Sequence, residues 1–337
     1  MANINLERDG LRDGMPRDER GLWRPDKDVG VPNPVFSWPP KPIEVAKWLK
    51  NYIWPFNVFY FIVVMITWLY LTPETSRMAE FRAGWILEIY ARNQVMLIAV
   101  AGLLHLRLWT KKAQGYQYKW SLNWMSKSRK FLWNDQARDN MFWSIASAGT
   151  IWTAFEVLMH WAYANGYIVY ADPRAHPAAF AIILFITPLW YFFYFYWAHR
   201  LLHTRKLYRF VHHVHHRNID VGPWSGLSQH PIEHVFMYAC MLLHWVIGAH
   251  PINMMYQGQL VTFGSIMSHG GFEDIVIKDG VTIPAYGNYW HSLHHRYFEC
   301  NYGEPEIPFD HLFGTNYDGS PEAREKMLAR RRAMHGN

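Results

Sequence analysis

Three groups of histidines stand close together in the second half of the chain. They are "HRLLH" at 199–203, "HHVHH" at 212–216 and "HSLHH" at 291–295. The first group has the form H-x-x-x-H, and the other two contain H-x-x-H-H. Because residues i, i+3 and i+4 lie on one side of a helix, each group is expected to present its imidazoles together.

Imidazoles gathered in this number indicate metal binding. Protonated histidines would repel one another, and each neutral histidine leaves a nitrogen lone pair that needs a partner. Zinc, copper, iron and nickel all bind imidazole. Eight nitrogens are too many for one four-coordinate ion and suit two metals with open positions. The predicted ligands are His199, His203, His212, His215, His216, His291, His294 and His295, whereas His213 lies off the shared face.

Two other classes of metal protein fit the pattern less well. A haem-binding electron carrier would place one or two histidines per haem on facing membrane spans. A metal transporter would hold its ligands near the bilayer midplane. The dense groups here follow the end of an apolar stretch instead, and scattered structural histidines would not crowd in this way. A metal-dependent enzyme is favoured, and a non-enzymatic membrane metal or electron carrier is the alternative.

The elements that must position these histidines are predicted to be membrane helices. A bilayer-spanning helix needs roughly 20 mainly apolar residues. Four stretches meet that length, at 53–71, 89–108, 141–164 and 178–198. A fifth apolar region at 235–267 is interrupted by "GAHP" and is expected to form a helical hairpin. A soluble all-helical protein with very aromatic helices is the alternative.

The distribution of basic residues supports the membrane interpretation. Eight Lys and Arg residues lie between 105 and 140, but only Arg174 lies between 165 and 176. Short cytoplasmic loops carry such an excess, so both termini, the 105–140 loop and the histidine groups are predicted to be cytoplasmic. This asymmetry explains the net charge of +6 without nucleic acid binding. Two cysteines make no disulfide framework and no CxxC pair.

The order of the histidine groups resembles the fatty acid hydroxylase/sterol desaturase superfamily of integral membrane di-iron enzymes. The resemblance covers about residues 180–316, and no motif of the first 140 residues matches. It is carried by "YWAHRLLH", "LYRFVHHVHH", "HPIEH" at 230–234, "NYWHSLHH" at 288–295 and "FDHLFGT" at 309–315.

Membership of that family would imply that the eight histidines hold two irons, which activate oxygen to hydroxylate or desaturate a lipid. Family members often have a further histidine in the preceding apolar helix, and His269 in "MSHGGFED" is therefore a predicted ninth ligand, the alternative being that it supports a ligand from behind. Zinc is expected to replace iron on overexpression, because it binds nitrogen sites more tightly than ferrous iron. The sequence contains no GxGxxG dinucleotide loop and no HPGG haem motif. A separate electron donor of the ferredoxin or cytochrome b5 type, with its reductase, is expected.

Four further residues are candidates for the surroundings of the metals. If "HPIEH" opens a helix, His230, Glu233 and His234 share one face. Glu233 is expected to orient ligand imidazoles, and His230 and His234 are weaker ligand candidates. Asp310 either orients a ligand in the same way or caps the turn before "LFGT".

Two features of the apolar stretches leave alternatives open. The aromatic run "WYFFYFYW" at 190–197 either lines a substrate slot beside His199 or forms an interfacial belt. Glu156 and His160 lie one turn apart in the third stretch. They either bind a substrate headgroup or satisfy each other, since ionisable residues within a membrane are candidates for function.

We therefore predict an all-α integral membrane protein with about four transmembrane helices, a helical hairpin and a cytoplasmic helical cap that carries the histidine groups. The predicted organisation is an irregular polar arm at 1–45, transmembrane helices and a basic loop at 46–140, a catalytic membrane domain at 141–316 and a basic tail at 317–337. The predicted function is hydroxylation of a lipid or sterol-like substrate by a multi-pass membrane oxygenase. Desaturation at the same site is the alternative.

Overall fold

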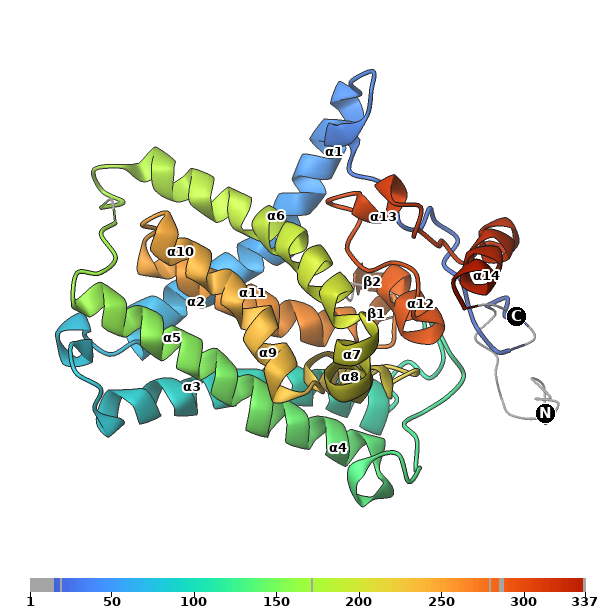
Figure 1. Cartoon of the computed structure of the whole chain (residues 1–337), viewed down its shortest axis with the longest axis horizontal. Helices are drawn as coiled ribbons and strands as arrows, with labels where there is room; N and C mark the ends of the chain where they lie inside the picture. Colours follow the sequence, from blue (N-terminus) through green and yellow to red (C-terminus); the bar gives the residue numbers. More distant parts are fainter. Residues whose placement is uncertain (1–14, 19, 171, 279, 285–287, 336–337) are drawn as a thin grey trace.

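The structure, a computed structural model, describes residues 15–18, 20–170, 172–278, 280–284 and 288–335. Helices dominate it, joined by short 3-10 and π-helical segments (Figure 1). The helices are α1 (Pro42–Tyr52), α2 (Val58–Leu71), α3 (Ala83–His105), α4 (Gln136–Trp143), α5 (Gly149–Ala164), α6 (Pro177–Leu202), α7 (Arg205–Leu207), α8 (His213–His216), α9 (Pro231–Tyr238), α10 (Leu243–Val246), α11 (Pro251–Ser268), α12 (Tyr289–Tyr297), α13 (Phe309–Leu312) and α14 (Pro321–His335).

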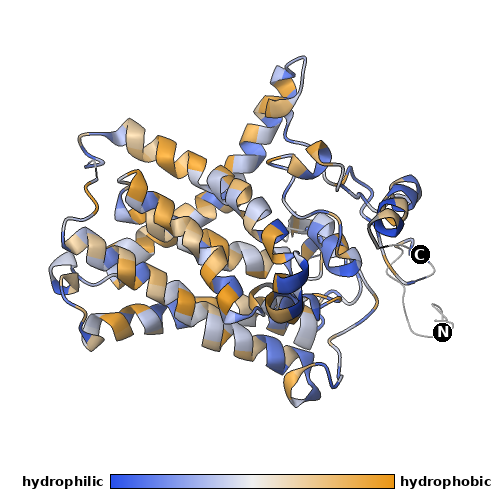
Figure 2. Cartoon of the chain, in the orientation of Figure 1, coloured by the Kyte–Doolittle hydropathy of each residue, from blue (hydrophilic) through white to orange (hydrophobic). Residues whose placement is uncertain are grey.

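Three helical stretches of the described chain are long and apolar enough to cross a membrane. They are Pro42–Leu71, Ala83–Thr110 and Pro177–Leu202, which correspond to three of the four predicted spans. Figure 2 shows hydrophobic residues along these helices and hydrophilic ones around α7, α8 and α14. The remaining predicted span is helical as α5 but is not among these three, so the count of four stays a prediction.

The α11 helix forms the centre of the bundle. It packs against α2, α3, α5 and α6, and nearly all of its residues are buried. A helix that is covered on every side needs no polar face, which agrees with the long apolar run in this part of the sequence. As expected, "GAHP" separates α11 from α9 and α10, and Gly248 turns the chain with a φ of 60°.

The histidine groups gather at one end of this bundle. Figure 1 shows α7, α8 and α12 close to the C-terminal end of α6. Proline at the first position of α6 favours its start, and Pro188 is accommodated within the helix. Its 26 residues end at Leu202, so His199 lies in the last turn and His203 follows as the C-cap.

One element was absent from the all-α prediction. Strands β1 (Asp274–Lys278) and β2 (Val281–Pro284) form an antiparallel hairpin between α11 and α12. The sequence "DIVIKDGVTIP" contains the signal for it, because β-branched residues flank a DG pair. Gly280 adopts a φ of 71°, which glycine allows without steric penalty.

The predicted N-terminal arm, 1–45, overlaps the start of α1 at Pro42, and part of its described stretch is buried. Residues 1–14 of the predicted arm lie outside the described residues. Trp23 packs with Trp120, Tyr289 and Leu293 in a small hydrophobic cluster that also includes Met327 of α14. The arm and the C-terminal helix therefore support α12 from outside the bundle.

Candidate metal centre

Short, capped helices hold the histidines in place. The α12 helix is capped by Asn288, whose Oδ1 accepts a hydrogen bond from the backbone N–H of His291 at 2.8 Å. It ends where Phe298 takes a φ of 68°. A π-helical turn, Tyr208–His212, leads into α8. His269 follows α11 as its C-cap, so four separate elements converge on one centre.

The structure brings all nine predicted histidines together, in two clusters. Within each cluster, one ligand atom from every residue lies within 4.8 Å of the others. All nine side chains are buried except that of His203, which is half-buried. The first histidine cluster is His199, His203, His212, His216 and His294, and the second histidine cluster is His215, His269, His291 and His295.

The clusters divide each H-x-x-H-H group, which differs from the expectation of one shared direction. His212 and His216 belong to the first cluster, whereas His215 belongs to the second. In the other group, His291 and His295 belong to the second cluster and His294 to the first. Pairs four residues apart stay together because they differ by only a small rotation about the helix axis. The third histidine points to the neighbouring cluster, so each group contributes to both.

Hydrogen bonds at Nδ1 fix the orientation of four rings. The Nδ1–H groups of His199 and His294 donate to the backbone carbonyls of Tyr302 and Cys300, at 2.7 and 2.6 Å. His269 donates to the carbonyl of Ser265 at 2.8 Å. His212 lies 2.8 Å from a carboxylate oxygen of Glu233. A carbonyl can only accept, so Nε2 of His199, His269 and His294 carries the lone pair that faces its cluster.

Burial keeps these imidazoles neutral. It lowers the pKa of His212, His216 and His294 well below the usual value, and neighbouring imidazoles lower it further. The pKa of His215 and His295 is lowered in the same way. A neutral imidazole is the form that binds metal, so the clusters are ready to bind metal at neutral pH.

Hydrogen bonds alone do not satisfy the first cluster. Its Nε2 atoms make five contacts of 3.1 Å with one another. In the neutral rings, His199 and His294 carry their protons on Nδ1, so at most three protons remain for five contacts. At least two contacts therefore cannot be hydrogen bonds, because they bring either two lone pairs or two N–H groups together. A cation bound by the Nε2 lone pairs would remove this repulsion.

The spacing of the nitrogens suits a transition-metal ion. Nitrogen ligands lie about 2.1 Å from such an ion, so two ligands at right angles are separated by about 3.0 Å. The contacts of 3.1 Å in the first cluster, and of 3.0 Å between His269 and His295 in the second, agree with this value. Five and four nitrogens leave room for a further ligand at each ion.

The lesser candidates take different places around the clusters. Glu233 is buried and contacts His212, and its orienting role stays a prediction. His230 caps α9 by accepting a hydrogen bond from the N–H of Ile232, and His234 contacts the Ser147 hydroxyl at 2.7 Å. Neither histidine is in a cluster.

Asp310 and His213 lie outside the ligand shell as well. Asp310 accepts hydrogen bonds from the N–H groups of Tyr302 and Gly303, at 3.0 and 2.8 Å. It therefore holds the loop whose Tyr302 carbonyl orients His199, rather than contacting an imidazole itself. His213 is exposed and belongs to neither cluster, in agreement with the prediction that it points away.

A cavity borders both clusters on the side of the bundle. His199, His212, His215, His269 and His291 line it, so it reaches ligands of both clusters. Tyr191, Phe192 and Phe195 of the aromatic run form part of its wall. Phe193 and Trp197 of the same run are exposed on the outside of α6. The run thus faces both the cavity and the outer surface of α6.

Several residues of this cavity were not predicted from the sequence. Gln229, Glu304 and Gly264 line it, and the Oε1 of Gln229 and the Oε2 of Glu233 are buried without a partner among the described residues. Single polar residues and glycines in loops or helices carry no spacing signal. The orienting carbonyls of Tyr302 and Cys300 are backbone atoms, which no residue type reveals.

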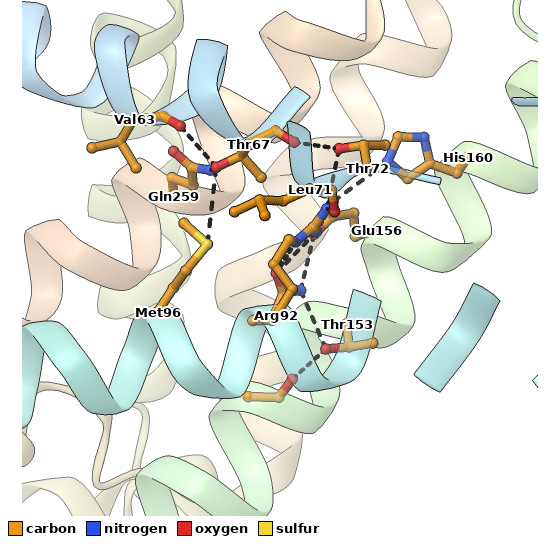
Figure 3. A network of polar contacts seen from close by, with 12 residues as sticks. Val63, Thr67, Leu71, Thr72, Arg92, Met96, Thr153, Glu156, His160 and Gln259 are labelled. Atoms are coloured by element: carbon orange, nitrogen blue, oxygen red, sulfur yellow. Dashed lines mark hydrogen bonds and ion pairs between the residues drawn. The ribbon is translucent and has the colours of Figure 1, made fainter. Parts of the chain in front are cut away.

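Glu156 and His160 satisfy each other and their neighbours rather than opening to a ligand. Glu156 pairs with Arg92, accepts from Asn93 at 2.9 Å and lies 3.4 Å from His160 (Figure 3). Arg92 also donates to the Leu71 carbonyl at the end of α2. Of the two alternatives for this pair, the structure favours the one in which Glu156 and His160 satisfy each other.

Comparison with known proteins identifies the class to which this site belongs. Residues 180–315 match the fatty acid hydroxylase family. This part of the chain is similar to the fatty acid hydroxylase/sterol desaturase superfamily.

Individual relatives share the same part of the chain. It is 31% identical over 139 residues to a Delta(7)-sterol 5(6)-desaturase of Gibberella zeae, covering 38% of this chain and 39% of the relative. It is 33% identical over 149 residues to a methylsterol monooxygenase of Aspergillus fumigatus, covering 41% and 47%. A very-long-chain aldehyde decarbonylase of Oryza sativa is 32% identical over 131 residues, covering 37% and 49%. The matches span less than half the length of these relatives. No solved structure is significantly similar to the chain.

Proposed function

We propose that the chain is a membrane-bound, oxygen-dependent two-metal oxidoreductase that hydroxylates an unactivated C–H bond of a lipid or sterol-like substrate. The observation that carries this proposal is the pair of adjoining histidine clusters beside a cavity with a partly aromatic wall. Nine neutral nitrogen ligands leave bound metals cationic, and the cavity gives a hydrocarbon access to them.

Two iron ions are the proposed occupants of the clusters. When bound, they would supply the oxidising power from O2 that a saturated C–H bond requires. Hydroxylation consumes one O2, two electrons and two protons, inserts one oxygen atom and releases one water. Zinc is expected as a partial substitute in overexpressed protein.

The residues of the chain have separate roles in this proposal. The nine histidines hold the metals, and Glu233 fixes the ring of His212 through a contact of 2.8 Å. Asp310 holds the loop that orients His199. Tyr191, Phe192 and Phe195 exclude water and leave space for a hydrocarbon. Excluding water protects a reactive site from side reactions.

Desaturation at the same site is the second candidate. It consumes the same O2, electrons and protons but removes two hydrogens from adjacent carbons and releases two waters. The relatives include a desaturase and a monooxygenase by name, which keeps both outcomes open. A non-enzymatic metal or electron carrier is the candidate from another class, and the cavity beside the clusters argues against it.

The proposed setting is a multi-pass membrane protein with its metal centre on the cytoplasmic side. The proposed catalytic domain is 141–316, preceded by the membrane helices and basic loop of 46–140. Electrons are proposed to come from a ferredoxin or a cytochrome b5 with its reductase.

Lipid profiling under ¹⁸O₂ tests the proposed function. Cells that express the wild-type chain should contain a lipid heavier by one ¹⁸O atom, and cells that express His294→Ala should not. A lipid lighter by two hydrogens, without label, would assign desaturation instead. Identical lipid profiles in an expressing and a non-expressing strain would contradict both.

A further inference from the structure

A second apolar pocket lies on the outer side of the bundle, between the start of α2 and α6. Ile53, Phe61, Leu184, Pro188 and Tyr256 are among its lining residues. Its lining contains no Lys, Arg, Asp or Glu. Ile53 and Phe185 are exposed at its edge, on helical stretches that are candidate membrane spans. We call this pocket the outer groove.

The cavity that borders both histidine clusters is called the metal-side cavity below. The outer groove and the metal-side cavity follow one face of α6. Ala181, Leu184 and Pro188 line the outer groove. Tyr191, Phe192, Phe195 and His199 line the metal-side cavity. These positions recur every three or four residues, which places them along a single helix face.

The same arrangement holds on α11, which packs against α6. Tyr256 lines the outer groove, and Leu260, Gly264 and Ser268 line the cavity. These four residues follow one another at intervals of four. On both helices, the metal-side cavity thus begins about one helical turn after the outer groove ends. From Pro188 to His199 the helix rises about 17 Å.

Gly264 keeps space open beside this face. A Cβ atom built on Gly264 would have no neighbouring atom within 4 Å. At Gly258, one and a half turns earlier, a Cβ would lie 2.7 Å from Nε1 of Trp152. Glycine is less favourable than alanine inside a helix, so a buried glycine usually serves close packing. Gly258 fits that explanation, whereas Gly264 borders empty space that leads to the histidines.

The polar groups of the outer groove are already paired. The Tyr52 hydroxyl donates to the Phe185 carbonyl at 2.6 Å, and the Tyr256 hydroxyl donates to Asn57 at 2.8 Å. The mouth therefore offers apolar walls and no free charge. A polar headgroup would find no free hydrogen-bonding or charged partner there. A hydrocarbon chain would exchange its contacts with lipid chains for contacts with the apolar walls of the groove.

We propose that the seam between α6 and α11 is the route by which the hydrocarbon part of the lipid substrate passes from the bilayer to the metal centre, and that Gly264 sets the width of this route. The inference rests on the proposed function and adds the path and the residue that selects the substrate. The occupant is the unbranched or fused-ring hydrocarbon of a bilayer lipid, long enough to span about 17 Å along α6.

Photolabelling of the full chain in nanodiscs tests the route. One arm uses a fatty acid that carries a diazirine in its chain, and the other uses a diazirine sterol. The labelled residues are located by mass spectrometry. At least one probe should label both the outer groove at 181–188 and the cavity wall at 260–264. Comparison of the arms then names the kind of hydrocarbon.

Three variants make the test specific. Gly264→Leu should reduce labelling of the cavity wall at least tenfold and leave labelling of the outer groove. Ala181→Trp should reduce both, because Ala181 lines the groove. Ala179→Trp is the matched control, since Ala179 is exposed on the same helix but does not line the groove. All three should keep the metal content of the wild type, which shows that they are folded.

Two results would overturn the route. One is cavity labelling that persists in Ala181→Trp, and the other is the absence of seam labelling by both probes in protein that holds its metals. These results are distinct from a failure of the proposed function. Seam labelling in protein that binds no metal would reject the two-metal enzyme and leave the route in place.

Discussion

Single residues decide which of the two histidine clusters an imidazole joins. His213 and His215 are two positions apart, yet His213 is exposed and His215 is buried among the imidazoles of the second cluster. Their neighbours in the sequence are nearly the same, so the difference between them comes from the helix face alone. Variants at these two positions therefore compare a ligand with a bystander in one segment.

We expect His215→Ala to lower the metal content from two ions per chain to about one. The second cluster would keep only three imidazoles, while the first would be intact. His213→Ala should keep both ions. Elemental analysis of the two purified variants measures this difference. Equal metal content in both variants would show that the assignment of faces is wrong.

Glu233 offers a second test at this scale, because it acts through His212. Loss of a hydrogen-bonding partner of a metal-bound histidine typically weakens metal affinity 10–100-fold. We expect this loss for Glu233→Ala and a smaller loss for Glu233→Gln, whose amide oxygen still accepts from Nδ1 of His212. Competition with a chelator measures the affinity. His234→Gln is the control, since His234 is buried nearby but contacts Ser147. If Glu233→Ala bound metal as tightly as the wild type, Glu233 would have no orienting role.

The sequence was informative about the clustered histidines and about Glu233, but it indicated only part of their surroundings. All nine clustered histidines were predictable from spacing and from the resemblance, His269 included. The division of each H-x-x-H-H group between the two clusters was not predictable, because it depends on where two metals would lie relative to three helices. The orienting carbonyls and the space beside Gly264 depend on tertiary structure and leave no pattern in the sequence.

Among the elements, three helices are joined by the ion pair of Arg92 and Glu156. Arg92 on α3 contacts Glu156 on α5 and the end of α2, and both side chains are buried (Figure 3). Removal of one partner of a buried pair costs about 3–5 kcal/mol, because the other charge is left uncompensated.

We expect Arg92→Met to be destabilised by about 3 kcal/mol or more. The double variant Arg92→Met with Glu156→Leu should regain most of this loss, since no charge remains unpaired. Denaturant unfolding of purified protein in detergent measures the difference. The metal content of the folded variants serves as the control and should be unchanged. A double variant that is no more stable than Arg92→Met would contradict the role of the pair.

Helices were predicted correctly where a long apolar stretch signalled them, whereas the short β-strands were not predicted. Three spans and the interrupted hairpin of α9 to α11 follow from hydropathy. The β-hairpin after α11 was not predicted, because its strands are short and follow a long apolar helix, although the DG pair between β-branched residues is a hairpin signal. The burial of Trp23 by distant parts of the chain could not be read from the arm itself.

For the whole molecule, the basic loop and the histidine clusters are predicted to lie on one side of the membrane. Both native cysteines are buried, so labelling of introduced cysteines has a low background. We expect Lys111→Cys to react with a membrane-impermeant maleimide from the cytoplasmic side. Val169→Cys, at an 82% exposed position, should react only from the other side. Reaction of Val169→Cys from the cytoplasm would overturn the topology.

The whole account depends on two metal ions per chain, and metal analysis of the purified protein tests this most directly. Protein from iron-replete cells should contain about two transition-metal ions per chain, with iron in the active fraction. Combined replacement of His203 and His295, one from each cluster, should remove both ions. Active wild-type protein that contains no transition metal would contradict the account.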